Sequence, residues 1–440
     1  MVAGSPDRII AFNGTVPVTV ARFERHVRAL ATRLPSGDYA INLCEDRYRF
    51  LVAFCAVALR GQVNLLPPSR ARSVVAETLL RYPDAYALGD GCMQAFAEIG
   101  RLGWRLPVAL AEADGASLMV DPDAVAAIGF TSGSTGRPTA NAKTWGSFRI
   151  STAQNLAALR GLWPEDARAH VVATVPPQHM YGMELSVMLP LLSDVGVHGG
   201  RPFFPQDVSH ALAETPGNRL LVTTPVHLRA LVESGVSLPP LAGIVSATAP
   251  MPVDLAREAE ARFGCELREM FGSTETCVIA SRRTAMTQAW TPYPGVSVQP
   301  QPDGSLVHAA HLSHPVALAD VVEVDPCGAF HLRGRQADLL EIAGKRASLS
   351  ELTHRLLAVP GVIDGVVFQL DALFVGGVGR IAALAVAPGM RAPEILASLR
   401  AHLDPVFLPR RMRCVDALPR NETGKLPRDD LLRLLGNGAN

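Results

Sequence analysis

The chain has 440 residues, of which 48% are hydrophobic, and its 41 basic and 41 acidic residues give a formal net charge of zero. This composition supports a large buried core and excludes global disorder. The charge balance lacks the basic footprint of a nucleic-acid-binding protein. Seven cysteines without zinc-site spacing predict free thiols in a reducing compartment.

The N-terminal residues lack the apolar segment of a signal peptide, and no long uncharged apolar run is present. We therefore expect a cytoplasmic protein without a membrane span.

The first part of the chain alternates apolar runs typical of strands with stretches typical of helices. This alternation predicts an α/β fold built from βα units. The predicted strands are Tyr39–Cys44, Gln62–Leu66, Ala124–Phe130, Val171–Val175, Arg219–Thr223 and Gly243–Ala247. The predicted helices are Phe50–Leu59, Glu184–Leu192, Pro225–Ser234 and Pro252–Phe263.

The pattern changes in the last third of the chain. Tyr293–Leu332 reads as short strands separated by turns, including Asp325–Gly328. A small unit follows, with predicted elements at Leu339–Ile342, Leu349–Leu357, Gly361–Gln369, Gly379–Val386, Ala392–Leu403 and Arg428–Leu435. We predict a large multi-sheet α/β N-terminal domain, residues 1–334, and a small α+β C-terminal lid domain, residues 335–440.

A loop rich in hydroxyl groups and glycine follows the strand Ala124–Phe130. Glycines let the backbone approach an anion closely, and successive N–H groups form an anion-binding nest. The loop predicts a nucleotide phosphate site, although a Ser/Gly surface linker has the same composition. It matches neither the Walker pattern nor the G-x-S-x-G elbow of serine hydrolases. Its residues are Thr131, Ser132, Gly133, Ser134, Thr135, Gly136, Arg137 and Pro138.

This loop resembles the signature loop of the adenylate-forming superfamily, which includes acyl- and aryl-CoA synthetases, peptide-synthetase adenylation domains and luciferases. Further matches follow in the family order, and the chain is identified as a member on all of them together. They are Phe271–Glu275, Asp320 followed by Gly334-Arg335, Gly344 and Arg346 with Glu351, and Leu418–Lys425.

The resemblance implies ATP-dependent activation of a carboxylic acid to an acyl-adenylate, with release of pyrophosphate and transfer to a pantetheine thiol. Lys425 then supplies a mobile charge between the carboxylate and the α-phosphate, as electrostatic catalysis requires. Glu275 holds Mg²⁺, and Thr274 contacts the α-phosphate. An exposed lysine without a catalytic role is the alternative for Lys425.

The resemblance also implies the nucleotide-binding residues. Phe271 covers one face of the adenine, and Gly272 and Ser273 belong to the same nucleotide-binding motif. Ala247 and Thr248 pack their backbone against the adenine. Asp320 binds the ribose hydroxyls, with Arg335 donating nearby. Core packing is the alternative for Phe271, and a plain strand-end turn is the alternative for residues 247–250.

Two positions depart from the family pattern. The loop ends in Pro138-Thr139 where the family has Pro-Lys, so Lys143 either replaces the missing lysine or is a surface residue. The family usually has an acidic residue or a lysine as a hinge two positions after the arginine of Gly334-Arg335. Here that position is Ala337, with Asp338 next to it.

The acid pocket is expected to involve His179, Tyr181, Gly182, Ala249, Thr276 and Cys277. The alternative is that Tyr181 only packs in the core and that His179 has its hydrogen bonds satisfied within the protein. The short chain resembles the ligases of aryl-polyene pigment clusters, which implies an aryl acid such as 3- or 4-hydroxybenzoate and an acyl carrier protein or coenzyme A as acceptor. A fatty or hydroxy-fatty acyl ligase, and a nucleotide-binding member with lost turnover, are the alternatives.

Overall fold

The computed structural model describes residues 1–91, 93, 103–132, 138–302, 304–335, 339–342, 345–370, 380–400, 403–421 and 426–436. The chain divides into two compact units. Met1–Val296 with Ala309–His314 forms the first, and Ser297–His308 with Pro315–Asn440 forms the second. The predicted boundary between a core domain, residues 1–334, and a C-terminal domain, residues 335–440, stays a prediction.

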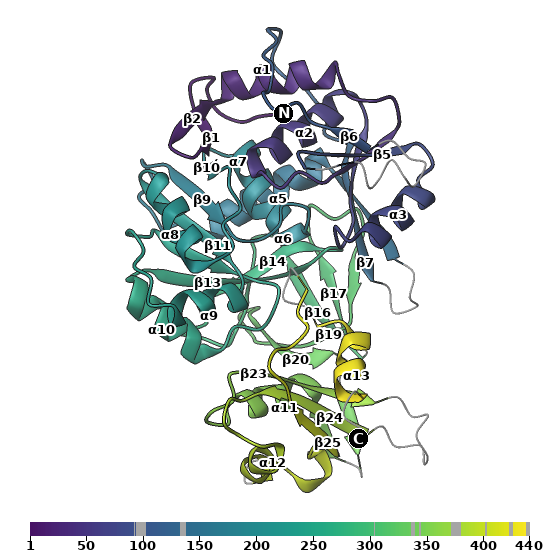
Figure 1. The fold of residues 1–440 in the computed structure, drawn as a ribbon, viewed down its shortest axis with the longest axis vertical. Coiled ribbons are helices and arrows are strands. Elements are labelled where there is room, and N and C mark those ends of the chain that lie inside the picture. Colours follow the sequence, from purple (N-terminus) through teal and green to yellow (C-terminus); the bar gives the residue numbers. More distant parts are fainter. Residues whose placement is uncertain are drawn as a thin grey trace. The chain divides into compact units, whose positions relative to one another are not determined.

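One sheet of the first unit carries the strand that leads to the signature loop (Figure 1). Its strands are parallel except for the antiparallel pair formed by the last two. In spatial order they are β6 (Gly103–Arg105), β5 (Ala85–Gly89), β3 (Tyr39–Asn42), β4 (Val63–Leu66), β7 (Val125–Ser132) and β8 (Pro138–Thr144).

A second sheet of this unit is parallel from β13 to β1, with antiparallel strands at both edges. In spatial order it contains β15 (Thr291–Pro292), β14 (Cys277–Arg282), β13 (Glu266–Ser273), β12 (Gly243–Ser246), β11 (Asn218–Thr223), β9 (Ala169–Ala173), β10 (Gly196–His198), β1 (Ile9–Asn13) and β2 (Val16–Thr19).

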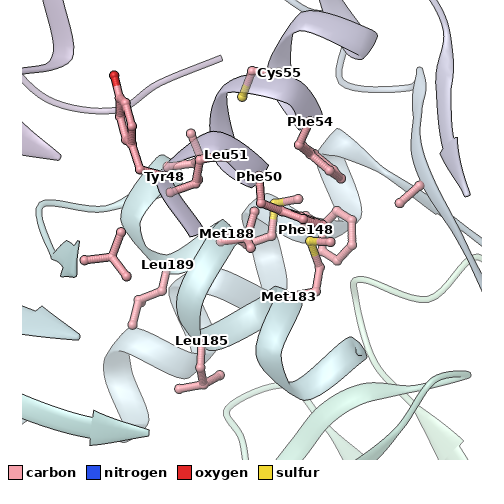
Figure 2. Close-up of a cluster of buried hydrophobic side chains, with 14 of the residues drawn as sticks. Tyr48, Phe50, Leu51, Phe54, Cys55, Phe148, Met183, Leu185, Met188 and Leu189 are labelled. Carbon is pink, nitrogen blue, oxygen red and sulfur yellow. The ribbon is translucent and has the colours of Figure 1, made fainter. Parts of the chain in front are cut away.

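The core of this unit is built on helices that are apolar around their whole circumference. A helix that is buried on all sides needs apolar residues on every face. In α2 (Arg47–Leu59) every residue from Phe50 to Val57 is buried. Figure 2 shows Phe50 and Phe54 beside Phe148 of α5 (Trp145–Ala158) and the methionines of the next helical segment. That segment comprises α6 (Met180–Met183), the π-helix η1 (Glu184–Met188) and α7 (Leu189–Leu192).

The other helices of the first unit are amphipathic to varying degrees. They are α1 (Val20–Ala31), α3 (Arg72–Arg81), α8 (Pro205–Glu214), α9 (Pro225–Glu233) and α10 (Val253–Phe263). Residues of α8, α9 and α10 form a separate apolar cluster with inward-facing residues of β9, β11 and β12.

The second unit is a smaller α+β assembly. Its strands are β16 (Ser297–Gln301), β17 (Gly304–His308), β18 (Val316–Leu318), β19 (Asp320–Val324), β20 (Phe330–Arg335), β21 (Leu339–Ile342), β22 (Lys345–Ser348), β23 (Asp364–Leu370), β24 (Arg380–Val386) and β25 (Arg411–Cys414). Its helices are α11 (Leu349–Leu357), α12 (Ala392–Arg400), the 3₁₀ turn η3 (Pro405–Phe407) and α13 (Arg428–Gly436).

The predicted fold class is confirmed: the molecule is a mixed α/β protein with several sheets and a smaller C-terminal part. The helix at Leu349–Leu357 has the predicted bounds, and the turn at Asp325–Gly328 joins β19 to β20. The predicted helix at Glu184–Leu192 begins earlier, at Met180, and contains a π-helical turn. No helix in the described ranges has the length and apolarity needed to cross a bilayer.

Candidate active site

The parallel strands β9, β11 and β12 end at one edge of their sheet, because their residues pair in register. In open α/β sheets, ligands bind outside the carboxyl ends of the strands. The segments that follow β9 and β12 contain the predicted pocket residues His179 and Tyr181 and the predicted adenine-side residues 247–249. The fold therefore brings these two predicted groups to one sheet edge.

The turn between β13 and β14 carries Thr274 and Glu275, both half-buried. A side chain at Gly272 would collide with the Cys277 carbonyl, so this position needs glycine. Cys277 adopts a left-handed backbone conformation with φ of 60°, which is uncommon for a residue with a Cβ atom. These two features fix a tight hairpin that presents Thr274 and Glu275 at its tip.

This turn lies directly against the strand that leads into the signature loop. A Cβ atom at Gly129 in β7 would lie 2.7 Å from Thr274 Cγ2 and 3.3 Å from Met180 Cε. Three motifs that are far apart in sequence therefore meet here: the end of β7, the Thr274–Glu275 turn and the start of α6. Among the predicted phosphate-loop residues, Thr131 and Ser132 end β7, while Gly133, Ser134, Thr135 and Gly136 lie outside the described residues.

Lys143 and His311 bind the backbone of the turn from inside the protein. The Lys143 ammonium donates a hydrogen bond to the Glu275 carbonyl, with 2.5 Å between Nζ and O. His311 donates from Nε2 to the Thr276 carbonyl at 2.7 Å, because a carbonyl oxygen can only accept. Lys143 is 6% exposed and His311 is 5% exposed, so Lys143 is not a surface residue.

Glu184 holds the other side of the same hairpin. Glu184 is 1% exposed, and its carboxylate accepts hydrogen bonds from Val278 N at 2.9 Å and from Asn155 Nδ2 at 3.0 Å. The Tyr293 hydroxyl donates to Asn155 Oδ1 at 3.0 Å. Burial raises the pKa of Glu184 to about 7, while these donors and the Lys143 charge oppose the rise. Burial lowers the pKa of His311, and its bond to the Thr276 carbonyl opposes this.

The predicted adenine-side residues lie around β12 and β13. The Phe271 ring packs against the aromatic ring of Trp290, with 5.4 Å between the ring centroids. Arg282 stacks on the same indole at 4.3 Å. Thr248 has a φ of 80°, and its buried Oγ1 atom has no hydrogen-bond partner within the described part of the chain. A strained residue with an orphaned hydroxyl is a frequent mark of a ligand site.

The segment after β9 is held by backbone contacts. A side chain at Gly182 would collide with the Pro176 carbonyl, and the Tyr181 hydroxyl donates to the Val245 carbonyl at 2.9 Å. Burial raises the pKa of Tyr181. His179 is half-buried and precedes α6 as its N-cap residue. A place for His179 and Tyr181 in an acid pocket stays a prediction.

Gln178, next to His179, is a residue that sequence reasoning missed. It is 3% exposed, and neither Nε2 nor Oε1 has a partner among the described residues. Sequence reasoning also missed Glu184 and His311. A carboxylate inside the apolar run from Met180 to Leu192 is a signal for Glu184, whereas nothing in the local pattern marks His311.

In the second unit, Asp320 begins β19 and pairs in register with Arg335 of β20. Gly334, beside Arg335, has a φ of 104°. Lys425 lies outside the described residues, as do Ala337 and Asp338.

Comparisons with known proteins agree with the predicted family. The model of the AMP-binding enzyme family matches residues 92–319. The chain is 30% identical to a 4-coumarate–CoA ligase of Rhodobacter capsulatus, over 67% of this chain and 73% of that protein. It is 25% identical to a sulfoacetate–CoA ligase of Cupriavidus necator, over 92% and 87% of the two chains.

Solved structures resemble the whole chain. The fold superposes with a TM-score of 0.82 on an o-succinylbenzoate coenzyme A synthetase of Bacillus subtilis solved with ATP and magnesium. The sequences are 20% identical, and the superposition covers 97% of each chain.

Proposed function

We propose, on the premise that this chain belongs to the AMP-binding enzymes of the adenylate-forming superfamily, that it activates an aryl acid such as 3- or 4-hydroxybenzoate. The protein is an AMP-forming carboxylate–thiol ligase that uses ATP and Mg²⁺. In the first step a carboxylate oxygen attacks the α-phosphorus, and the bond to pyrophosphate breaks. In the second step a pantetheine sulfur attacks the acyl carbon, and AMP leaves.

The observation that carries this proposal is the packing of Thr274 on Gly129. This contact supports a site in which Thr274 and Glu275 act beside β7, the strand that continues into the hydroxyl-rich loop. Both substrates are anionic, so positioning and charge neutralisation dominate the catalysis. A site formed by the phosphate loop and this turn would provide both positioning and charge neutralisation.

The residues of the turn fit a magnesium–nucleotide complex. Magnesium is usually held by one or two carboxylates together with substrate phosphates, and Glu275 supplies one half-buried carboxylate. Within the described ranges, no three His, Cys, Asp or Glu side chains gather as a metal cluster. When bound, Mg²⁺ neutralises phosphate charge; Glu275 holds it, and Thr274 orients the α-phosphate.

The proposal gives Lys425 the charge between carboxylate and α-phosphate, and Asp320 with Arg335 the ribose hydroxyls. Ala247 and Thr248 receive the adenine beside Phe271. The orphaned Thr248 hydroxyl supports a polar contact at this point.

The aryl-acid assignment rests on two lines of support. The 4-coumarate–CoA ligase relatives are named for an aryl acid. The buried, unpartnered amide of Gln178 at the same sheet edge favours an acid with a neutral polar substituent, such as a ring hydroxyl. We propose coenzyme A or an acyl carrier protein as the acceptor. A reducing, cytoplasmic location is part of the proposal, supported by free thiols such as Cys44 and Cys55.

The test is ATP–pyrophosphate exchange with hydroxybenzoates, benzoate, cinnamates and fatty acids side by side. We expect exchange with hydroxybenzoates, and Lys425→Ala is expected to reduce it about 10²–10³-fold while ATP binding is retained. Exchange only with fatty acids would replace the aryl assignment. ATP binding without exchange for any acid would favour a member with lost turnover. Coenzyme A and a phosphopantetheinylated carrier protein are then compared as acceptors.

A further inference from the structure

We infer that Lys143 is a positioning residue: it holds the Glu275 carbonyl, and it acts on the reaction through the shape of the Thr274–Glu275 turn and not by touching phosphate. This inference rests on the proposed role of Glu275. His311 acts beside Lys143 on the next carbonyl of the turn. Together they fix where the Glu275 carboxylate is presented.

Burying Lys143 is costly. The residue is 6% exposed, and a buried charge is expensive unless it is paired. Its hydrogen-bond partner is the Glu275 carbonyl, and the Cys277 thiol and the Glu184 carboxylate are near enough to interact with its charge. All of these partners lie on or beneath the hairpin, so the charge is directed at the turn.

Several side chains hold the turn at once. Three buried groups from three separate segments bind its backbone: Lys143 from β8 at residue 275, His311 from the loop 309–314 at residue 276, and Glu184 from η1 at residue 278. The left-handed Cys277 and the crowded Gly272 make this hairpin strained. Such conformations persist only where the surroundings over-determine them.

The Lys143 ammonium directs a donor at the turn and lies on a strand position away from the phosphate loop. An ammonium has three N–H donors, and the Glu275 carbonyl takes one at the short distance of 2.5 Å. In the β7–β8 pair, Lys143 lies opposite Ala127, whereas the phosphate loop follows only after Ser132, the last residue of β7. A lysine that supports a metal-binding carboxylate from behind is expected to tune metal affinity, since outer-shell partners typically change affinity or activity by about 10–100-fold.

The experiment compares Lys143→Met, which keeps the side-chain length, with Arg149→Met, which removes a cation at an exposed position of the adjacent helix. Two readouts do not depend on turnover: Mn²⁺ binding to the enzyme–ATP complex by electron paramagnetic resonance, and ATP binding by calorimetry without metal. The third readout is the Mg²⁺ dependence of pyrophosphate exchange, with the hydroxybenzoate and ATP saturating.

For Lys143→Met we expect about tenfold weaker Mn²⁺ binding and an exchange kcat lowered about 10–100-fold. Metal-free ATP affinity stays within about threefold of wild type, and Lys143→Arg recovers part of the loss. Arg149→Met leaves all three values unchanged. Weaker metal-free ATP binding with unaltered Mn²⁺ affinity would overturn the inference in favour of direct phosphate contact.

A second variant covers the case in which Lys143→Met fails to fold. His311→Leu removes the donor to the neighbouring carbonyl, and we expect the same metal-specific loss, while His311→Gln restores a donor and part of the affinity. Normal Mn²⁺ affinity in His311→Leu would contradict the inference. Failure of the proposed function is separate, because wild-type enzyme would then show no exchange with any acid, and Glu275→Gln would not change Mn²⁺ binding.

Discussion

Asp320 and Arg335 are directly opposite each other across the antiparallel pair β19–β20. The left-handed Gly334 precedes Arg335, and the register shifts between Val321 and Val322. The hairpin thus brings these two chain positions opposite each other, although 14 residues of sequence lie between them. We expect both to serve one ligand group, the ribose hydroxyls.

Asp320→Asn is therefore expected to weaken ATP binding about 10–100-fold, because hydrogen bonds to a charged group contribute roughly 1.5–3 kcal/mol. Calorimetric titration with ATP measures this. Glu323→Gln on the same strand is the control, because its ion pair with Arg333 is mostly solvent-exposed and contributes little. Equal affinities for the two variants would remove Asp320 from the nucleotide site.

Gly129→Ala is expected to lower the exchange rate at least tenfold. The new methyl group would lie 2.7 Å from Thr274 Cγ2, so the Thr274 side chain must leave its position against β7. The double variant Gly129→Ala with Thr274→Ser removes that methyl carbon and keeps the hydroxyl, and it is expected to recover activity. A Gly129→Ala enzyme with a normal kcat would show that Thr274 need not sit against β7.

Gln178→Leu is expected to reduce selectivity for hydroxybenzoate over benzoate by at least tenfold. A buried amide that bonds a substrate hydroxyl is left unpaired by benzoate, and replacing it with an apolar side chain removes this penalty. The measurement is kcat/KM for both acids in pyrophosphate exchange. An unchanged ratio would place Gln178 away from the acid.

His227 is expected to make stability fall in mild acid. Its Nδ1 contacts Thr174 Oγ1 at 3.0 Å and Thr224 Oγ1 at 3.1 Å, and burial lowers its pKa from 6.5 to about 4, with the Arg201 charge adding to the shift. Between these values the unfolded chain binds a proton that the folded protein does not. The stability contribution is therefore complete above pH 6.5 and is lost as the pH falls toward 4.

Urea unfolding of wild type and His227→Asn over this pH range tests the point. The free energy of unfolding of wild type is expected to fall more steeply, by up to about 1.4 kcal/mol per pH unit for one proton. Parallel curves for the two proteins would mean that His227 titrates normally in the folded state.

Local patterns in the sequence were sufficient for the fold class, the helix at Leu349–Leu357, the turn at Asp325–Gly328 and the composition of the phosphate loop. Periodicity and turn chemistry act over a few residues, so one segment carries the whole signal. The likeness of Phe271–Glu275 to a family motif is local in the same way. The sequence therefore indicated the residue types of the proposed site but not their arrangement in space.

The support beneath the site was decided only by the tertiary structure. Lys143 and Glu275 are 132 residues apart, and Thr276 and His311 are 35 apart, so no local pattern records their contacts. Whether Lys143 faced solvent or the hairpin depended on which side of β8 the core covered. The sequence by itself determined which groups carry charge and hydroxyls, and packing alone decided which of them are buried against the turn, because burial is a property of all the surrounding chain.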